Sequence, residues 1–219
     1  MKARGEEPAP QSPADSASAV LTRIPLFPLN AVLFPEGPLK LRIFEARYVD
    51  MIGRCLREGT SFGIALIVEG VEAGGEAQAA SIGTSARIVD FEKLQDGLLG
   101  VTALGERSFE IRSVSRQPDG LNVATVEWLP AAAALPVPAD CEYLVRLLQH
   151  ALPQLAPIYD FTPIRYDDAA WVSARLVEIL PLPLDEKQHC LEMQDPLQRL
   201  DHLRMRVKVE AVEQEKDLQ

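Results

Sequence analysis

The sequence has few of the residues that build metal, disulfide and nucleotide sites. Its 219 residues include only three cysteines, and no two of them form a Cys-x-x-Cys pair. Their odd number and wide spacing argue against a disulfide scaffold and a zinc site, and favour a reducing, cytoplasmic location. No Gly-Lys dipeptide occurs, so there is no P-loop for a nucleoside triphosphate. We therefore expect no cofactor and no metal.

Long apolar runs and a basic charge balance are also missing. No stretch approaches the roughly 20 apolar residues that span a bilayer, and the first 20 residues lack the apolar core of a secretory signal. The formal net charge of −10 repels phosphate backbones. We therefore expect neither a membrane nor, as a general partner, a nucleic acid.

Strand patterns fill the first part of the chain. Residues 24–34 are apolar and interrupted by prolines, which is typical of an edge strand, and a turn follows at 35–38. A helix is predicted over 45–57, where the apolar residues recur at helical spacing. The predicted strands are 39–43, 62–68, 82–94, 98–104, 109–114 and 121–129, with a flexible loop at 69–80. A shift of the alternation within 121–129 predicts a bulge.

Helical periodicity takes over after the Pro/Ala-rich segment at 130–140. The expected helix starts are Asp140, Asp167 or Asp168, Asp185 with Gln188 in a capping box, and Asp195 before Pro196. Pro153 and Pro157 are expected to end the first of these helices. The predicted units are a disordered leader (1–20), a strand-rich unit (21–130), a helical unit (131–212) and a frayed tail (213–219). Strands followed by helices predict an α+β fold with segregated layers.

Catalytic patterns are scarce, and the sharpest is Gly-Thr-Ser-Phe-Gly at 59–63, which fits the Gly-x-Ser-x-Gly elbow of serine hydrolases. That elbow needs a strand before the serine and a helix after it, whereas Ser61 follows a helix and precedes a strand. The three histidines, His150, His189 and His202, all fall in the helical unit. Ser61 is therefore interpreted as a loop residue, and catalysis remains the alternative.

Two Leu-Phe-Pro triplets, at 26–28 and 33–35, precede a basic amphipathic segment. Extended Phe-Pro steps present apolar side chains with few backbone donors, and a neighbouring sheet edge accepts an unfolded segment in many peptide-binding proteins. The residues expected to line such a surface are Phe34, Pro35, Phe44, Arg47 and Tyr48. The alternative is that the phenylalanines fill the core, because large apolar residues are usually buried.

The stretch IPLFPLNAVLFPEGPLKLRIFEARYVDMI closely resembles the start of the Lon N-terminal domain family. Further segments continue the resemblance: SFGIALI, SIGTSARIVDFEKLQDGLLGVTALGERSFEI, NVATVEWLP and WVSARLVEILPLPLDEKQHCLEMQDPLQRL. The resemblance covers roughly residues 22 to 207 and extends to the stand-alone bacterial form.

The resemblance implies a PUA-like β pseudo-barrel with one helix, followed by an α-helical subdomain. It also implies a non-catalytic module that binds polypeptide segments or partner proteins, without the ATPase and protease domains of Lon. Two alternatives stay open: a small serine hydrolase that uses Ser61, and an RNA-binding protein, because PUA-like folds also bind RNA.

Overall fold

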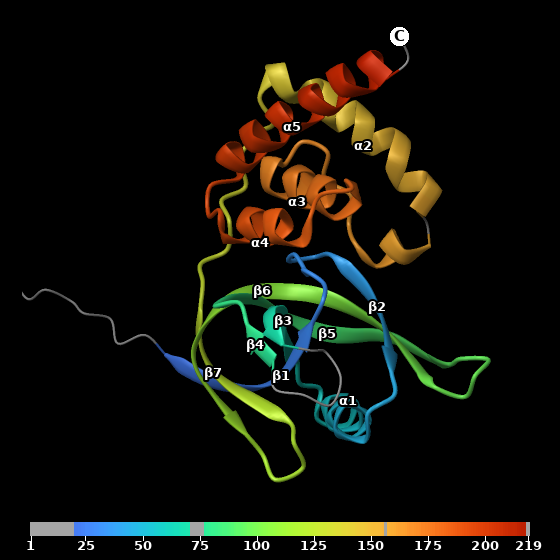
Figure 1. Ribbon diagram of the computed structural model, residues 1–219, viewed down its shortest axis with the longest axis vertical. Coiled ribbons are helices and arrows are strands. Elements are labelled where there is room, and N and C mark those ends of the chain that lie inside the picture. Colours follow the sequence, from blue (N-terminus) through green and yellow to red (C-terminus); the bar gives the residue numbers. More distant parts are fainter. Residues whose placement is uncertain (1–19, 71–76, 156, 218–219) are drawn as a thin grey trace, which may run out of the picture.

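The computed structural model describes residues 20–70, 77–155 and 157–217. A strand-rich half is followed by a helical half, which confirms the α+β class (Figure 1). The strands are β1 (Leu21–Leu29), β2 (Pro38–Ile43), β3 (Phe62–Gly70), β4 (Ala77–Ala79), β5 (Ile82–Lys93), β6 (Leu99–Arg116) and β7 (Asn122–Trp128). The helices are α1 (Ala46–Glu58), α2 (Glu142–Leu155), α3 (Ala169–Ile179), α4 (Leu184–Glu192) and α5 (Pro196–Asp217), with short 3-10 helices η1 (Ala139–Cys141) and η2 (Ile158–Phe161).

The sheet closes into a barrel because β1 has two partners along its length. Its first part pairs antiparallel with β7, and its last residues pair in parallel with β3. The ring therefore runs β1-β7-β6-β5-β3 and returns to β1. β4 pairs antiparallel with the end of β3, and β2 pairs with β6; both lie outside the ring. Closure pairs the ring strands on both sides. The six-residue β2 and the three-residue β4 lie outside the ring, and each has one partner strand in the described part of the chain.

The prediction of an edge strand over 24–34 was wrong in its extent and its pairing. β1 ends at Leu29, so Phe34 lies outside it. At Pro25 the strand pairs only with β7, and at Pro28 it pairs only with β3. Proline lacks an N–H donor and is tolerated where one side of the strand has no ladder partner. Pro25 and Pro28 therefore lie at positions where β1 pairs with one neighbouring strand only, although β1 belongs to a closed ring.

The predicted break between strands at 98–104 and 109–114 is absent, because β6 is continuous. In its pairing with β5, Glu106 and Arg107 lie opposite Ser85 alone, which forms a bulge that bends the strand. The predicted bulge near residues 121–129 also lies on β6, at Arg112. Each bulge interrupts the alternation of apolar and polar residues along β6. One continuous strand therefore looks like two strands in the sequence.

The predicted loop at 69–80 is shorter than expected. Residues 69–70 continue β3, and residues 77–79 form β4, which pairs back on β3. The remaining part, 71–76, lies outside the described residues.

α1 agrees with its predicted range and buries Tyr48, Met51 and Cys55 against the barrel. Gly59 ends the helix in the left-handed conformation, with φ of 64°. Phe44, directly before the helix, has 59% of its surface exposed. Phe44 precedes the helix, so its direction is set by β2 and not by the helical period.

Two of the predicted helix caps in the second half are confirmed. The Asp168 carboxylate accepts from the Ala170 N–H at 2.9 Å, and the Asp195 carboxylate accepts from the Leu197 N–H at 2.9 Å. α2 continues past Pro153 and ends two residues later at Leu155. Proline lacks the N–H that would pair with the preceding turn, so the helix loses one backbone hydrogen bond there.

The capping box predicted at Asp185 was wrong. α4 begins at Leu184 with Pro183 at the N-cap position. Gln188 instead points toward the barrel, where its Nε2 donates to the Ile82 carbonyl oxygen at 3.0 Å. α5 runs to Asp217, beyond the point at which fraying was expected.

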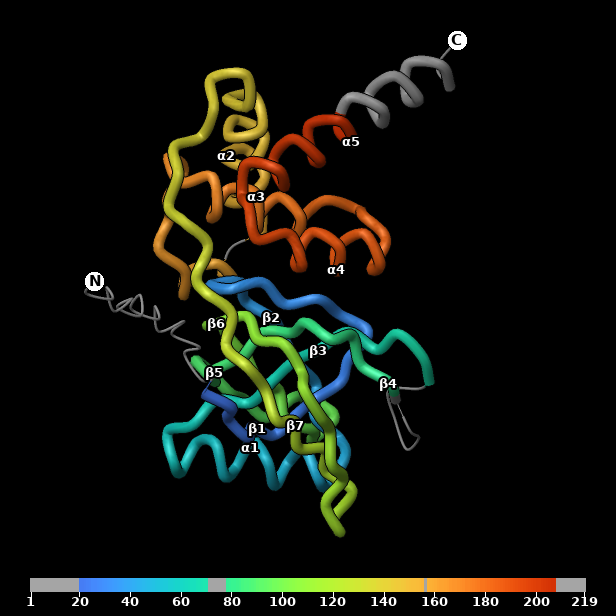
Figure 2. Tube along the Cα trace, turned by 90° about the vertical axis from the view of Figure 1, so that its left-hand side faces the viewer, coloured from blue at the N-terminus to red at the C-terminus, as the bar shows by residue number. Residues whose placement is uncertain are grey.

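α2 to α5 cover one end of the barrel, and α1 lies at the opposite end (Figure 1). Figure 2 shows the connection between β7 and α2 running up one side of the molecule from the barrel to the helices. The predicted division near residue 130 falls within this connection, and the independence of the two units remains a prediction. The helical half has its own apolar core, separate from those of the barrel.

Candidate recognition surfaces

The second Leu-Phe-Pro triplet is a wedge between the two halves. Phe34 is 1% exposed and packs into the core of the helices, not into the barrel. The Arg199 guanidinium lies 5.5 Å from the centre of the Phe34 ring. The carbonyl oxygen of Pro35 accepts from Arg175 Nη2 at 2.9 Å. The barrel half therefore inserts an aromatic side chain and a backbone acceptor into the helical half.

The turn after the wedge is held from both sides. Glu36 has a φ of 60°, and its N–H donates to the Gly105 carbonyl at 2.8 Å. From the helical half, Thr162 Oγ1 donates to the Glu36 carbonyl at 2.7 Å, and Arg165 forms an ion pair with the Glu36 carboxylate. Such a residue with positive φ persists only where its surroundings fix it. The wedge and turn thus join the two halves tightly.

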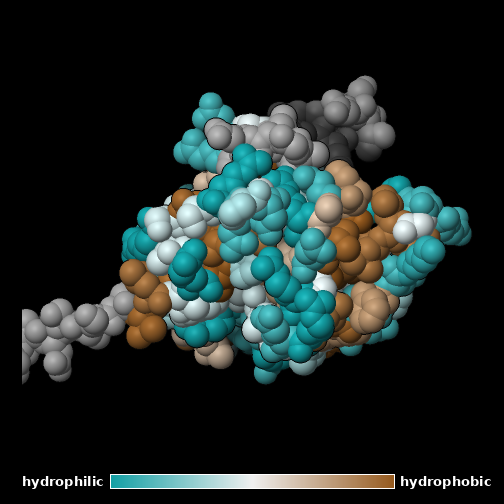
Figure 3. All heavy atoms as spheres, turned by 90° about the horizontal axis from the view of Figure 1, so that it is seen from below, coloured by the Kyte–Doolittle hydropathy of each residue, from teal (hydrophilic) through white to brown (hydrophobic). Residues whose placement is uncertain are grey.

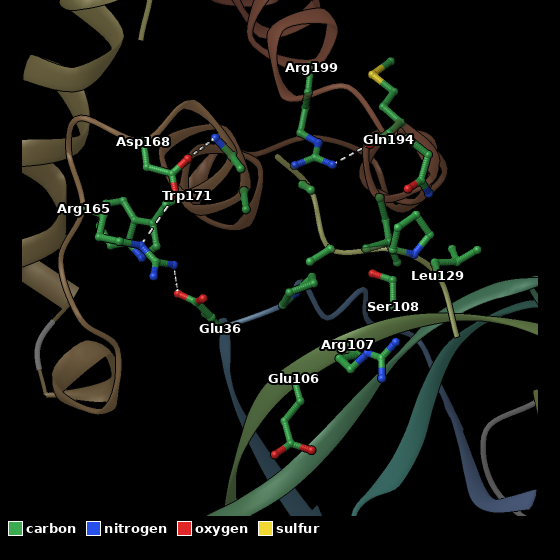
Figure 4. Close-up of a pocket in the computed structure, with 18 residues that line it drawn as sticks. Glu36, Glu106, Arg107, Ser108, Leu129, Arg165, Asp168, Trp171, Gln194 and Arg199 are labelled. Carbon is green, nitrogen blue, oxygen red and sulfur yellow. Dashed lines mark hydrogen bonds and ion pairs between the residues drawn. The ribbon is translucent and has the colours of Figure 1, made fainter. Parts of the chain in front are cut away.

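The joined halves enclose a cleft of about 170 Å³, here called the inter-subdomain cleft (Figure 4). One wall comes from the barrel and the connection after β7, and the other comes from the helices. Its lining includes Pro35, Ser108, Leu129, Ala132, Trp171 and Arg199. The walls are mostly apolar, with polar groups at separate points.

Arg199 is the main buried charge at this cleft, with 6% of its surface exposed. Its Nε donates to the Cys190 carbonyl at 2.8 Å, and its Nη2 donates to the Met193 carbonyl at 2.6 Å. Its Nη1 donates to Ser173 Oγ at 3.3 Å. No carboxylate forms an ion pair with it among the residues the structure describes. Burial lowers the pKa of the Arg199 guanidinium, because the charged form is desolvated.

A second hollow, the β2 groove, lies beside the unpaired edge of β2 and has a volume of about 300 Å³. Its lining includes Phe27, Leu29, Leu39, Leu41, Phe44 and Tyr48. Tyr48 stacks on Phe27 with ring centres 3.8 Å apart. The Arg47 guanidinium lies 4.7 Å from the Tyr48 ring centre, and Nη1 donates to the Gly120 carbonyl at 2.8 Å. Seen from below, apolar side chains gather in a hollow beside a protruding lobe (Figure 3).

The structure separates the five residues that were expected to form one surface. Phe34 is buried, so its expected place on a surface was wrong and the core alternative holds for it. Pro35 lines the inter-subdomain cleft, whereas Phe44 and Tyr48 line the β2 groove. Arg47 anchors α1 to the turn at Gly120. A binding role for any of them remains a prediction.

The polar residues of the inter-subdomain cleft were missed by the sequence reasoning. Neither Trp171 nor Arg199 was singled out. A single arginine in an amphipathic helix is usually solvated, so its sequence carries no signal of burial. Only the packing of α5 against α3 and α4 reveals it.

Ser61 lies in the loop between α1 and β3, as its interpretation as a loop residue required. Its Oγ donates to a carboxylate oxygen of Glu106 at 2.5 Å. In the described part of the chain it has no hydrogen bond to a histidine. His202, for example, contacts Glu186 at 2.8 Å in the helical half. The arrangement lacks the serine–histidine contact of a catalytic triad.

Cys55, Cys141 and Cys190 are free and buried. Within residues 20–70, 77–155 and 157–217, no group of three or more His, Cys, Asp or Glu side chains is placed to hold a metal ion. No described helix is both long and apolar enough to cross a membrane.

Comparison with known proteins relates this architecture to a known family. The ATP-dependent protease La (LON) substrate-binding domain matches residues 23–209. The chain is similar to the crystal structure of a Lon N-terminal domain protein from Xanthomonas campestris, with 35% identity and a TM-score of 0.70, over 84% of this chain and 98% of that chain. It is also similar in fold to the N-terminal domain of Mycobacterium avium complex Lon protease, with 19% identity and a TM-score of 0.59, over 83% and 96% of the two chains.

A curated relative is the protein cereblon of Xenopus tropicalis, which is 27% identical over 146 residues. That match covers 64% of this chain and 31% of cereblon, so the chain spans less than a third of that relative. The family match, in contrast, covers almost all of the barrel and the helices. The chain belongs to the family of ATP-dependent protease La (LON) substrate-binding domains.

Proposed function

We propose that this chain is a non-catalytic recognition module that binds extended polypeptide segments at the β2 groove. Membership of a substrate-binding family supports a substrate or partner recognition role. The observation that carries the finer proposal is the edge of β2, which pairs with β6 on one side and opens onto an apolar groove on the other. Extended peptides add to such edges through backbone hydrogen bonds, and neighbouring pockets take alternate side chains.

Phe44 is the side chain on which this proposal depends most. It is 59% exposed at the end of β2 and lines the groove, so a bound segment would cover it. Exposed aromatic residues that become buried on binding commonly supply much of the binding energy. Tyr48 and Phe27 form a rigid, stacked floor below it, which limits the entropy lost on binding.

The test uses an array of unfolded peptide segments whose C-termini are attached to the support. We expect weak binding of apolar segments by the unchanged protein. Phe44→Asp should weaken it at least tenfold, because it places a charge in the groove. Phe91→Asp is the matched control, since Phe91 is 58% exposed on β5 and does not line this groove. No binding above background, or equal binding by both variants, would contradict the proposal.

The hydrolase alternative has a separate test. A serine-reactive fluorophosphonate should not label the protein, since Ser61 has a carboxylate and not a histidine as its hydrogen-bond partner. Labelling that Ser61→Ala abolishes would replace the present proposal with a catalytic one.

RNA binding remains a prediction of lower rank, because the net charge of −10 opposes it. A cytoplasmic location likewise stays a prediction, and the three free cysteines are compatible with it.

A further inference from the structure

We propose that the inter-subdomain cleft binds the C-terminal residue of a polypeptide and that its carboxylate is the group recognised. This inference rests on the proposed polypeptide-binding function, but it concerns a second surface at the other end of the barrel from α1. The cleft, the charges that line it and the connection after β7 supply the argument.

Three acids and three arginines line the cleft, and each acid pairs with an arginine other than Arg199. Of the acids that line it, Glu36 and Asp168 both pair with Arg165. Glu106 accepts from Ser61 and pairs with Arg87 at 3.6 Å. Figure 4 shows the Glu106 carboxylate directed away from the other labelled side chains. The acids are therefore engaged elsewhere.

The two remaining arginines, Arg107 and Arg199, have no carboxylate partner in the described part of the chain. Arg199 is the important one, because a buried cation without a counter-charge is costly. Three of its five N–H donors are used by Cys190, Met193 and Ser173, which leaves two available. A ligand carboxylate would supply the missing charge and accept these donors.

A buried donor without a partner belongs to Trp171, which lines the same cleft. Trp171 is 3% exposed, and its Nε1–H has no hydrogen-bond partner among the described residues. Buried indole N–H groups usually find a partner, and one without a partner calls for an explanation. An oxygen acceptor of a bound peptide group would satisfy it.

The size and walls of the cleft favour a chain end over a long segment. Its volume of about 170 Å³ is below the roughly 300–1,000 Å³ of ordinary small-molecule sites. Pro35, Leu129 and Ala132 form apolar walls that suit one small aliphatic side chain. Capture of a C-terminal carboxylate is a recurring mode of peptide recognition.

The connection after β7 offers backbone groups to the same ligand. Residues 131–134 are exposed and make no backbone hydrogen bond in the described structure. Ala131 and Ala132 line the cleft, while Ala133 and Ala134 do not. The residue before the terminal carboxylate would thus lie beside unpaired backbone donors and acceptors, as in the addition of a short strand.

The experiment measures fluorescence polarisation with three N-terminally labelled peptides that differ only in their last residue or C-terminal group. The first is Gly-Ser-Ala-Val-Leu with a free carboxylate, and the second is the same peptide with a C-terminal amide. The third has an amide end and aspartate as its last residue. We expect the free acid to bind at least about tenfold more tightly than the other two, since a charge-assisted contact is lost in one and misplaced in the other.

Two substitutions of exposed residues test whether the peptide binds in the cleft without disturbing the core. Ala132→Glu puts an anion into the cleft and should weaken the free-acid peptide about tenfold, whereas Ala134→Glu adds the same charge to the same connection outside the cleft and should change affinity less than twofold. Equal affinity of acid and amide peptides, equal binding of the amidated aspartate peptide, or equal effects of the two variants would overturn the assignment. The peptides fixed to the array by their C-termini test the β2 groove alone, so the two proposals fail separately.

Discussion

The two Leu-Phe-Pro triplets have the same residues and entirely different surroundings. In the first, Phe27 lies in β1 and stacks on Tyr48 of α1, in the core shared by the barrel and that helix. In the second, Phe34 leaves the sheet and fills the core of the helical half. Identical local sequence therefore produces a ring strand in one case and a wedge between subdomains in the other.

The difference lies in what each proline faces. Pro28 lies in a strand that pairs with β3, so its carbonyl group belongs to a ladder region. Pro35 precedes a turn, and its carbonyl is bound by Arg175, which also pairs with Glu178 at 2.6 Å in the buried interior. The Pro35 carbonyl accepts a hydrogen bond from an arginine of the helical half, so it links the two halves. The Pro28 region pairs only with a neighbouring strand of the barrel.

Truncating the aromatic ring of each triplet should give the largest effect and tests most directly whether the two triplets have different roles. Phe34→Ala and Phe27→Ala should each destabilise the protein by about 3–5 kcal/mol, as the removal of a buried ring usually does. Only Phe34→Ala should loosen the helices from the barrel, because only that ring joins the two halves. Urea unfolding measures the first effect. Limited proteolysis at residues 130–140 measures the second, and equal cleavage of both variants would show that the wedge does not join the halves.

Added methyl groups beside each triplet give a smaller effect. A Cβ at Gly105 would approach the Phe34 carbonyl oxygen to 2.1 Å, and this backbone atom has no rotamer by which to move away. A Cβ at Gly63, which pairs with Leu26, would meet side-chain atoms of Ile24 and Phe109 at 2.9 Å. We expect both substitutions to alanine to destabilise, with Gly105→Ala costing about 1 kcal/mol more in urea unfolding. The reverse order would mean that the turn at the wedge adapts more readily than the barrel core.

Thiol reactivity is expected to show the smallest effect, and it reports on the two halves separately because each contains a buried free cysteine. Burial raises the pKa of the Cys55 thiol in the barrel and raises that of Cys190 in the helical half to about 11. A raised thiol pKa leaves almost no thiolate at pH 7.5, so both should react slowly with a disulfide reagent, and faster as the pH rises. In Phe34→Ala, labelling mapped by mass spectrometry should quicken at Cys190 and not at Cys55. Equal acceleration at both would indicate global unfolding.

Sequence reasoning succeeded where the signal was local. The α+β class follows from the change of periodicity near residue 130, and the caps Asp168 and Asp195 follow from the chemistry of helix starts. It failed where two distant segments decide the outcome. Gln188 fits a capping box but bonds to Ile82 of the barrel, and β6 reads as two strands because its bulges interrupt the alternation.

The candidate sites show the same limit. Phe44 was expected on a binding surface from its sequence context; it lies exposed beside the β2 groove, and its binding role remains a prediction. Arg199 and Trp171 were not identified as site residues, because nothing next to them in the sequence predicts burial at a cleft. Their significance comes from α5 and α3 meeting the connection after β7.

By itself, the sequence determined the order of the strand-rich and helical halves, the helix caps Asp168 and Asp195 and the lack of a P-loop, because these depend on spacing between near neighbours. Only the tertiary structure decided which Leu-Phe-Pro triplet joins the two halves, which edge stays open and which arginine is buried without a counter-charge. Such outcomes depend on the desolvation and packing of groups far apart in the chain, and local propensity carries no record of that environment.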